Sequence, residues 1–177
     1  MGASEQHIPT FPDAVDSSKS MVFSIAWHFL RDRSLAEELA QDVFLELHRN
    51  WRSMKSAEHI VFWLRKVTSH RAIDVLRSRR AKPETSLEET AEPTALERVN
   101  DSLLASYLER MVASLPEKQR VAIVLRYQEG MEPEEIAKVL EMNVSSVKTN
   151  LARGLALLRT KTASRLKREE PETHDTV

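Results

Sequence analysis

Short polar and cationic side chains near the C-terminus are the part of the chain best suited to bind another molecule. They share one side of a helical pattern between positions 144 and 159, and they are Ser145, Ser146, Lys148, Thr149 and Arg153. Hydroxyl groups can hydrogen-bond to base edges in a major groove, whereas Lys and Arg neutralise phosphates. The residue types therefore predict noncovalent DNA binding.

Two short helices are needed to position these side chains. Pro133 suits the first turn of a helix, and apolar residues follow it at helical spacing as far as Leu140. The corner is Glu141-Met142-Asn143, where Asn143 can cap a second helix. The apolar stripe of that second helix is Val144, Val147, Leu151, Leu155 and Leu158. Together these features predict a helix-turn-helix.

A plain amphipathic hairpin with a solvated basic face is the alternative for this segment. The distribution of charge argues against it. From Asn143 to Arg168 every charged residue is positive, although the formal net charge of the whole chain is only -1. Solvated faces usually mix both signs, so the segregation favours a nucleic-acid partner.

A second cationic surface is predicted on a helix over Ile60–Arg80. Its apolar positions suit a core, whereas six cations oppose the single acid Asp74; they are Arg65, Lys66, Arg71, Arg77, Arg79 and Arg80. Phe62 and Trp63 lie beside them and have two possible roles. Aromatic rings at helical spacing are usually core residues, but rings next to cations also suit single strands, whose bases stack on them.

An acidic face is predicted on the helix Leu35–Trp51, with Ser34 as its N-cap and Glu37 completing a capping box. The outward positions are Glu37, Glu38, Gln41, Asp42, Leu45 and Glu46. This face suits either solvent or a partner. A core helix over Ser20–Leu30 precedes it, and a loop over Arg52–His59 follows it.

Composition limits the fold to soluble helices. The chain has 177 residues, 41% of them hydrophobic, with three glycines and no cysteine, which excludes disulfides and thiolate zinc sites. We expect an all-α fold of two small helical domains. The expected boundaries are a disordered leader over 1–18, a first domain over 19–81, a flexible acidic linker over 82–101, a helix-turn-helix domain over 102–166 and a tail over 167–177.

These motifs resemble those of the extracytoplasmic-function (ECF) sigma factors of the sigma-70 family, the promoter-recognition subunits of bacterial RNA polymerase. AEELAQDVFLEL is similar to their polymerase-binding helix. FWLRKVTSHRAIDVLRSRR is similar to the helix that reads and melts the minus-ten element. The domain that reads the minus-thirty-five element is similar to LPEKQRVAIVLRYQEGMEPEEIAKVLEMNVSSVKTNLARGLALLR.

The resemblance implies a role for each candidate residue. The polymerase-binding residues would be Glu38, Gln41, Asp42 and Leu45. The residues for minus-ten DNA would be His59, Trp63, Arg65, Lys66, His70, Arg71, Asp74 and Arg77, with base capture by the loop over 53–59. The residues for minus-thirty-five DNA would be Ser145, Ser146, Lys148, Thr149, Asn150 and Arg153.

Three positions depart from the family pattern. Glu141 stands at a corner that usually has Gly, where a left-handed conformation would cost about 1 kcal/mol. Asn150 replaces a frequent basic residue, and His70 replaces a frequent Asn. Each departure bears on which promoter sequence the chain prefers.

Other functions fit less well. The six histidines form no i, i+4 pair, and there is no glycine-rich phosphate loop or nucleophile elbow, so no enzyme, metal or cofactor is expected. The resemblance implies a cytoplasmic monomer without membrane insertion. Its expected partners are the beta-prime and beta subunits of core RNA polymerase, double- and single-stranded promoter DNA, and an anti-sigma factor. The rival is a helix-turn-helix regulator that binds a palindrome as a dimer without polymerase.

Overall fold

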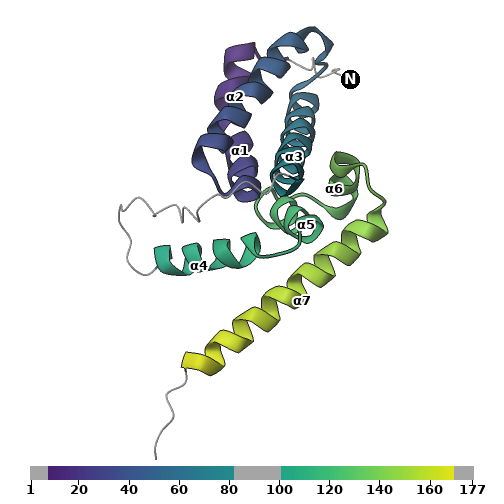
Figure 1. Ribbon diagram of the computed structural model, residues 1–177. Coiled ribbons are helices and arrows are strands. Elements are labelled where there is room, and N and C mark those ends of the chain that lie inside the picture. Colours follow the sequence, from purple (N-terminus) through teal and green to yellow (C-terminus); the bar gives the residue numbers. More distant parts are fainter. Residues whose placement is uncertain (1–7, 82–100, 170–177) are drawn as a thin grey trace, which may run out of the picture.

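The computed structural model describes residues 8–81 and 101–169, and the secondary structure in these ranges is entirely helical (Figure 1). The predicted acidic linker over 82–101 lies outside the described residues except for its last position, as do residues 1–7 and 170–177. None of the described helices combines the length and the apolar character that crossing a membrane requires.

The N-terminal helical group packs α1 against both of the other long helices. Its elements are α1 (Phe11–Leu30), α2 (Arg33–Arg49), the 3-10 helix η1 (Trp51–Ser53) and α3 (Ala57–Ala81). The apolar stripes predicted from the sequence meet here, because Val22, Val43 and Leu64 are completely buried where the three helices face one another.

Helix α1 starts earlier than the predicted Ser20, so the leader predicted over 1–18 was too long. The hydroxyl of Thr10 caps the helix by accepting a hydrogen bond from the main-chain N–H of Asp13, at 3.4 Å. The ring of Phe11 packs edge-on against Trp51, with the ring centroids 5.3 Å apart. Burial of this first turn against α2 and η1 is a long-range effect that local periodicity did not reveal.

Two other boundaries differ from the sequence prediction. Asp32, not Ser34, caps α2, since its carboxylate accepts a hydrogen bond from the N–H of Leu35 at 3.0 Å. The predicted loop before α3 ends sooner, because the hydroxyl of Ser56 accepts from the N–H of His59 at 3.1 Å. His59 is therefore inside α3 and not in the loop.

The C-terminal helical group packs α7 across α5 and α6. Its elements are α4 (Asp101–Ala113), α5 (Glu117–Tyr127), α6 (Pro133–Leu140) and α7 (Val144–Glu169). Gly154 is buried where α7 crosses α5. Helix α7 continues through Glu169, so the first three residues of the tail expected over 167–177 belong to this helix.

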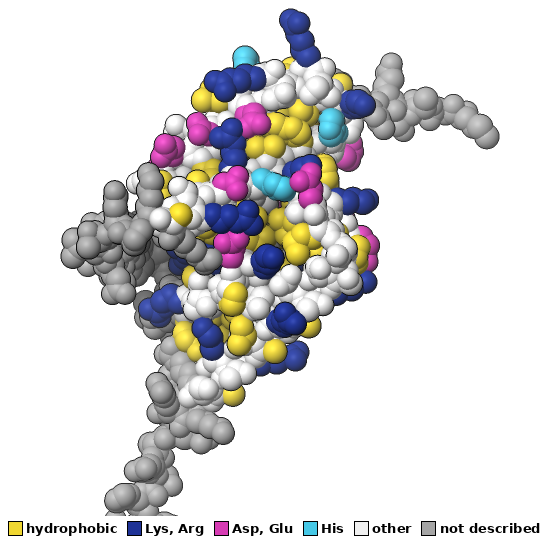
Figure 2. Space-filling view, turned by 45° about the vertical axis from the view of Figure 1, so that its right-hand side comes forward, with side chains coloured by type: hydrophobic (Ala, Val, Ile, Leu, Met, Phe, Trp, Pro, Cys, Tyr) yellow, Lys and Arg dark blue, Asp and Glu magenta, His cyan; other side chains and the backbone are white. Residues whose placement is uncertain are grey.

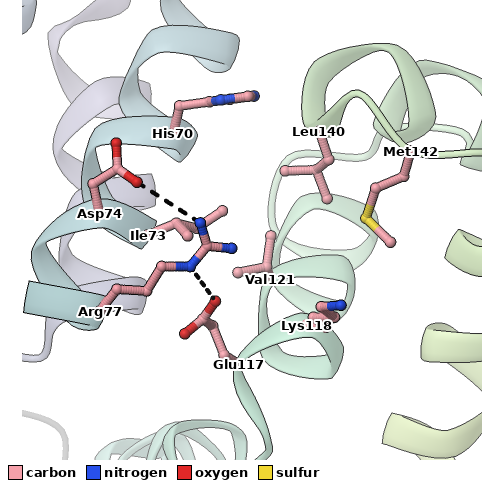
Figure 3. Close-up of a pocket in the computed structure, with 9 residues that line it drawn as sticks. All are labelled: His70, Ile73, Asp74, Arg77, Glu117, Lys118, Val121, Leu140 and Met142. Carbon is pink, nitrogen blue, oxygen red and sulfur yellow. Dashed lines mark hydrogen bonds and ion pairs between the residues drawn. The ribbon is translucent and has the colours of Figure 1, made fainter. Parts of the chain in front are cut away.

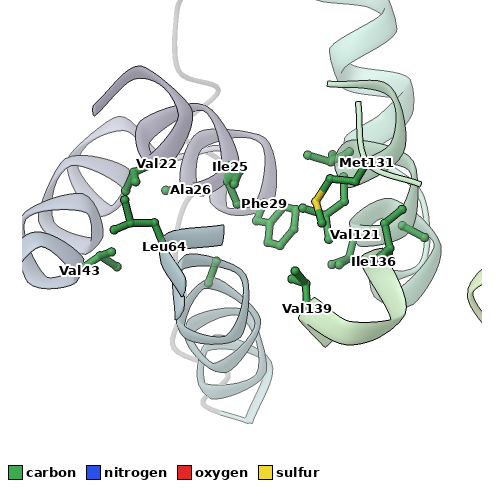
Figure 4. Packing of buried hydrophobic residues seen from close by; sticks show 14 of the residues in the cluster. Val22, Ile25, Ala26, Phe29, Val43, Leu64, Val121, Met131, Ile136 and Val139 are labelled. Carbon is green, nitrogen blue, oxygen red and sulfur yellow. The ribbon is translucent and has the colours of Figure 1, made fainter. Parts of the chain in front are cut away.

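The two groups share one hydrophobic core. Phe29 of α1 is completely buried and points toward Val121 of α5 and Met131 (Figure 4). Helix α3 also contacts α6, while α1 contacts α4 and α5. Consequently the described helices are arranged as one closed unit, with the N-terminal group lying against one side of the helix-turn-helix (Figure 1).

Candidate nucleic-acid interface

The helix-turn-helix is built by local caps. Helix α6 begins with a capping box, in which the N–H of Glu132 donates to the carboxylate of Glu135 at 2.8 Å. It ends at Glu141, whose φ of 54° places the residue in the left-handed region. Helix α7 then begins where the side-chain oxygen of Asn143 accepts from the N–H of Ser146 at 2.7 Å. The Asn143 cap agrees with the sequence prediction, and the corner at Glu141 adopts the left-handed conformation whose cost was considered from the sequence.

The cationic face of α7 is open to solvent. Ser145, Lys148, Thr149 and Arg153 are exposed, whereas Ser146 and Asn150 are partly buried. The amide of Asn150 donates to the main-chain oxygen of Ser146 at 2.9 Å, so part of its hydrogen-bonding capacity is used within the helix. Lys148 forms an ion pair with Glu134 of α6, with 3.2 Å between nitrogen and oxygen. Lys148 would have to exchange this carboxylate for a phosphate on binding DNA.

On the side of the molecule drawn in Figure 2, the pattern of charged side chains changes from top to bottom. In the upper and middle parts, Lys and Arg side chains alternate with Asp and Glu. In the lower part, Lys and Arg occur among hydrophobic side chains without visible acids. This segregation follows the run of positive charges along the sequence of α7 and suits a polyanion.

The acidic face of α2 is also accessible. Glu38, Gln41 and Asp42 are exposed, and Leu45 beside them is 56% exposed. A single exposed leucine is common on protein surfaces, but this one lies among acidic and amide groups and adds an apolar contact to a polar face. The arrangement suits a protein partner that offers both cations and an apolar contact.

Arg71 of α3 connects this acidic face to the second cationic surface. Its guanidinium pairs with Asp42 at 3.5 Å and forms a closer ion pair with Glu46. Asp42 is a predicted polymerase-binding residue and Arg71 a predicted minus-ten residue. The two predicted surfaces therefore share an ion-pair cluster, which sequence spacing alone did not reveal.

Two neighbouring residues of α3 contact the C-terminal group. The guanidinium of Arg65 donates to the main-chain oxygen of Glu129 at 3.3 Å. The ammonium of Lys66 lies 2.7 Å from the carboxylate of Glu141. Its hydrogen bond and its charge lower the pKa of Glu141, so this carboxylate is ionised at neutral pH. Both cations are expected from the sequence to face DNA, and no local pattern in the sequence indicates their contacts across the two groups.

A cleft separates the rest of α3 from α5 and α6 (Figure 3). His70, Asp74 and Arg77 line it from α3, with apolar side chains such as Val121 opposite. Arg77 pairs with Glu117 at 3.3 Å and lies 3.9 Å from Asp74. Three predicted minus-ten residues are thus at the boundary between the two groups.

The aromatic residues of α3 differ in burial. Phe62 is 37% exposed, whereas Trp63 is partly buried against the core. The ring nitrogen Nδ1 of His59 accepts a hydrogen bond from the N–H of Lys55 at 3.2 Å. Phe62 is therefore better placed than Trp63 for stacking, although it was not among the predicted site residues.

Family models match both parts of the chain. The model described as "Sigma-70 region 2" matches residues 14–82. The model described as "Sigma-70, region 4" matches residues 105–158. The first match contains the acidic face of α2 and the cations of α3, and the second contains the helix-turn-helix.

Curated relatives match over most of their length. The chain is 29% identical to the ECF RNA polymerase sigma factor SigW of Bacillus subtilis over 164 residues, covering 84% of this chain and 87% of SigW. It is 30% identical to the ECF RNA polymerase sigma factor SigK of Mycobacterium bovis over 156 residues, covering 84% of this chain and 83% of SigK.

Two solved structures have a similar fold. One is the sigma factor RpoE in complex with the anti-sigma factor NepR from Bartonella quintana, with a TM-score of 0.65 and 17% identity, covering 85% of this chain and 94% of that chain. The other is CnrH in complex with the cytosolic domain of CnrY, with a TM-score of 0.66 and 20% identity, covering 87% and 88%.

Proposed function

Because the chain belongs to the ECF RNA polymerase sigma factors of the sigma-70 family, we propose that it binds core RNA polymerase and directs transcription initiation at specific promoters. Sigma factors act as initiation factors, so the proposed activity is binding without catalysis. The observation that carries it is the exposed cationic face of α7 on a chain that also exposes an acidic face on α2.

The acidic face of α2 is the proposed polymerase contact. Glu38, Gln41 and Asp42 would bind cations of the beta-prime subunit, while Leu45 would bury its exposed side chain. Burying a leucine contributes about 1.5–3 kcal/mol, and the surrounding carboxylates would select a basic partner. This combination supports a specific protein contact.

Helix α3 and the segment before it are the proposed minus-ten site. The role needs cations for the backbone of a melted strand, and Arg65, Lys66 and Arg71 supply them once their present partners are released. Holding a base outside the stack costs a few kcal/mol. The exposed ring of Phe62 can offset part of this cost, because base stacking on an aromatic ring contributes about 1–3 kcal/mol.

Helix α7 is the proposed reader of the minus-thirty-five element. Lys148, Thr149 and Arg153 are exposed near its N-terminus, which is the part of a recognition helix that contacts base edges. The partly buried Ser146 would contribute through its hydroxyl. The C-terminal half of α7 would follow the backbone.

A transcription assay tests the proposal. Core bacterial RNA polymerase, alone and with this protein, would be supplied with a pool of genomic promoter fragments. We expect discrete transcripts that need the protein and that disappear when Gln41→Ala and Asp42→Ala are combined. Asp16→Asn is the control, because it also removes one negative charge but lies in an exposed pair with Lys19 on α1.

A regulator that acts without polymerase predicts a different result. It would bind one duplex tightly as a dimer, with no protein-dependent transcript even from polymerase of the same source. That outcome would replace the proposed function. A sigma factor, in contrast, would be a monomer in the bacterial cytoplasm and would bind promoters strongly only together with core polymerase.

An anti-sigma factor is a further proposed partner. NepR, the protein bound to the RpoE relative, is an anti-sigma factor, and the exposed acidic and cationic faces here would suit such a partner. Adding a candidate anti-sigma protein from the same genome should abolish the protein-dependent transcripts. Transcripts made with an unrelated sigma factor should persist.

A further inference from the structure

Two residues other than glycine adopt a left-handed backbone within the described ranges. They are Arg31, with φ 55°, and Glu141, with φ 54°. Each is the C-cap of a helix, Arg31 for α1 and Glu141 for α6, and each uses its main-chain N–H to close the last turn. Glycine is the residue that adopts this conformation without strain, so a side chain at both places calls for an explanation.

Both side chains cross the boundary between the two helical groups. The guanidinium of Arg31, from the N-terminal group, lies 3.0 Å from the carboxylate of Glu109 in α4. Glu141, from the C-terminal group, lies 2.7 Å from the ammonium of Lys66 in α3. The guanidinium of Arg31 also lies 4.7 Å from the centre of the Trp27 ring, which holds it in place. In each ion pair a C-cap residue thus contacts a side chain of the other group, Arg31 from the N-terminal group and Glu141 from the C-terminal group.

Contacts between the two helical groups also engage the face of α3 that would bind a melted strand. Lys66 is itself paired, Arg65 donates to the main chain of Glu129, and His70 lies 2.8 Å from the main-chain oxygen of Val139. Arg77 pairs with Glu117 across the cleft (Figure 3). While α5 and α6 lie against α3, these groups are therefore held by partners within the chain, and a strand would have to displace those partners, although the side chains of Lys66 and Arg77 are still 37% and 61% exposed.

We propose that Arg31 and Glu141 form a C-cap latch, made of the Arg31–Glu109 and Glu141–Lys66 ion pairs, which keeps the isolated chain closed and its α3 face away from DNA. The inhibitory role rests on the proposed function. The strained backbone is retained because glycine at either cap would remove the side chain that reaches across. Contact with core polymerase would then be the event that separates the two groups.

The latch biases the closed form without locking it. Both pairs are partly exposed, with side-chain exposures of 25% and 36% for Arg31 and Glu109 and 37% and 63% for Lys66 and Glu141. Such a pair changes an equilibrium roughly 1.5- to 5-fold. The apolar contacts of Phe29 hold the same boundary, so loss of the latch should shift the closed population without abolishing it.

Distance measurement on the isolated protein is the primary test. The chain has no cysteine, so Ser20→Cys on α1 and Ala156→Cys on α7, both at exposed positions, provide two specific spin-label sites. We expect a longer component in the distance distribution for Arg31→Gly and for Glu141→Gly. Because Arg31 and Glu141 are far apart, the double variant should change the ratio of open to closed chains by about the product of the two single changes.

Further variants separate charge from folding. Glu141→Gln keeps the left-handed cap but removes the charge, and it should open the chain as Glu141→Gly does. Combining Lys66→Glu with Glu141→Lys keeps the ion pair with its charges exchanged. This variant should therefore show the short distance between the spin labels. Asp16→Asn, on α1, should change nothing. If the double glycine variant keeps its helical circular dichroism and an unaltered distance distribution, the latch does not exist.

Binding of a labelled single-stranded DNA pool tests the inhibition. The open variants should bind it a few-fold more tightly than the wild type; opening without tighter binding would overturn the inhibitory role. The distance measurement uses the isolated protein and involves no polymerase. A wild type that directs transcription but shows no latch would refute only this inference. If the latch opens as expected but no variant directs transcription with core polymerase from the same source, the proposed function fails.

Discussion

The ring of His70 in α3 donates a hydrogen bond from Nε2 to the main-chain oxygen of Val139 in α6, at 2.8 Å. A carbonyl oxygen only accepts, so Nε2 carries the hydrogen. Val139 lies in the last turn of α6, where main-chain oxygens lack a partner within the helix. A residue predicted to read the minus-ten element therefore caps the first helix of the helix-turn-helix.

Loss of this hydrogen bond should destabilise the closed arrangement. We expect His70→Ala to lower the free energy of unfolding by about 0.5–1.5 kcal/mol, measured by urea denaturation. His70→Gln keeps a side-chain N–H and should recover most of the loss. Equal losses for both variants would show that the ring's packing, and not its hydrogen bond, stabilises the boundary.

The stability of the chain should depend on the ionisation of Glu129. Burial raises the pKa of this carboxyl, and the opposing effects of Arg65, Ser24 and His28 are smaller. The folded state therefore holds the proton more tightly than the unfolded state, and the ionised group is destabilising at neutral pH. We expect Glu129→Gln to raise the melting temperature at pH 7.

The sign of this effect can be followed with pH. The advantage of Glu129→Gln should shrink as pH falls through the raised pKa, and it should vanish below the unfolded value of about 4.3. Asp16→Asn, at an exposed position with the same change of charge, should show no such advantage. An advantage independent of pH would mean that packing and not ionisation is responsible.

Arg153 should act in promoter recognition and not in polymerase binding. It is exposed on the face of α7 away from α5 and α6, so Arg153→Ala should leave the fold intact. We expect promoter use to weaken by about 1–3 kcal/mol if Arg153 contacts a base. The readout is promoter binding by the holoenzyme at several salt concentrations.

Salt dependence distinguishes two contacts for Arg153. A phosphate contact would weaken binding equally for all promoters and reduce the salt slope by about one. Lys19→Ala, an exposed cation on α1, is the control for net charge. Loss of core polymerase binding in Arg153→Ala would contradict the role proposed for α7.

The contact of α7 with α5 depends on the absence of a side chain at Gly154. A Cβ atom there would lie 3.0 Å from Cγ1 of Ile123, which is buried. Gly154→Ala gains helix propensity of about 1 kcal/mol against this tight contact, so its net effect should be small. Gly154→Val adds further bulk and should destabilise by about 1–3 kcal/mol in thermal unfolding. An unaffected Gly154→Val protein would show that α7 and Ile123 can shift apart far enough to fit the larger side chain.

Local patterns in the sequence predicted much of the fold. Pro133 at the start of α6, the corner at Glu141 and the cap at Asn143 all act within one or two turns of chain, so their residue types are informative by themselves. Buried positions in α2 and α3 followed the helical period for the same reason. Starts of helices were less predictable where, as at Phe11, a contact distant in sequence stabilises the first turn.

The sequence by itself determined the helices, the apolar face of each and the helix-turn-helix, because these depend on periodicity and on caps a few residues away. It also determined which side chains are cationic or acidic. Only the tertiary structure decided that Lys66 and His70 face α6, and that Arg71 contacts Asp42. Those pairings depend on how Phe29 packs against the C-terminal group. No local pattern encodes that packing, because it joins residues about a hundred positions apart.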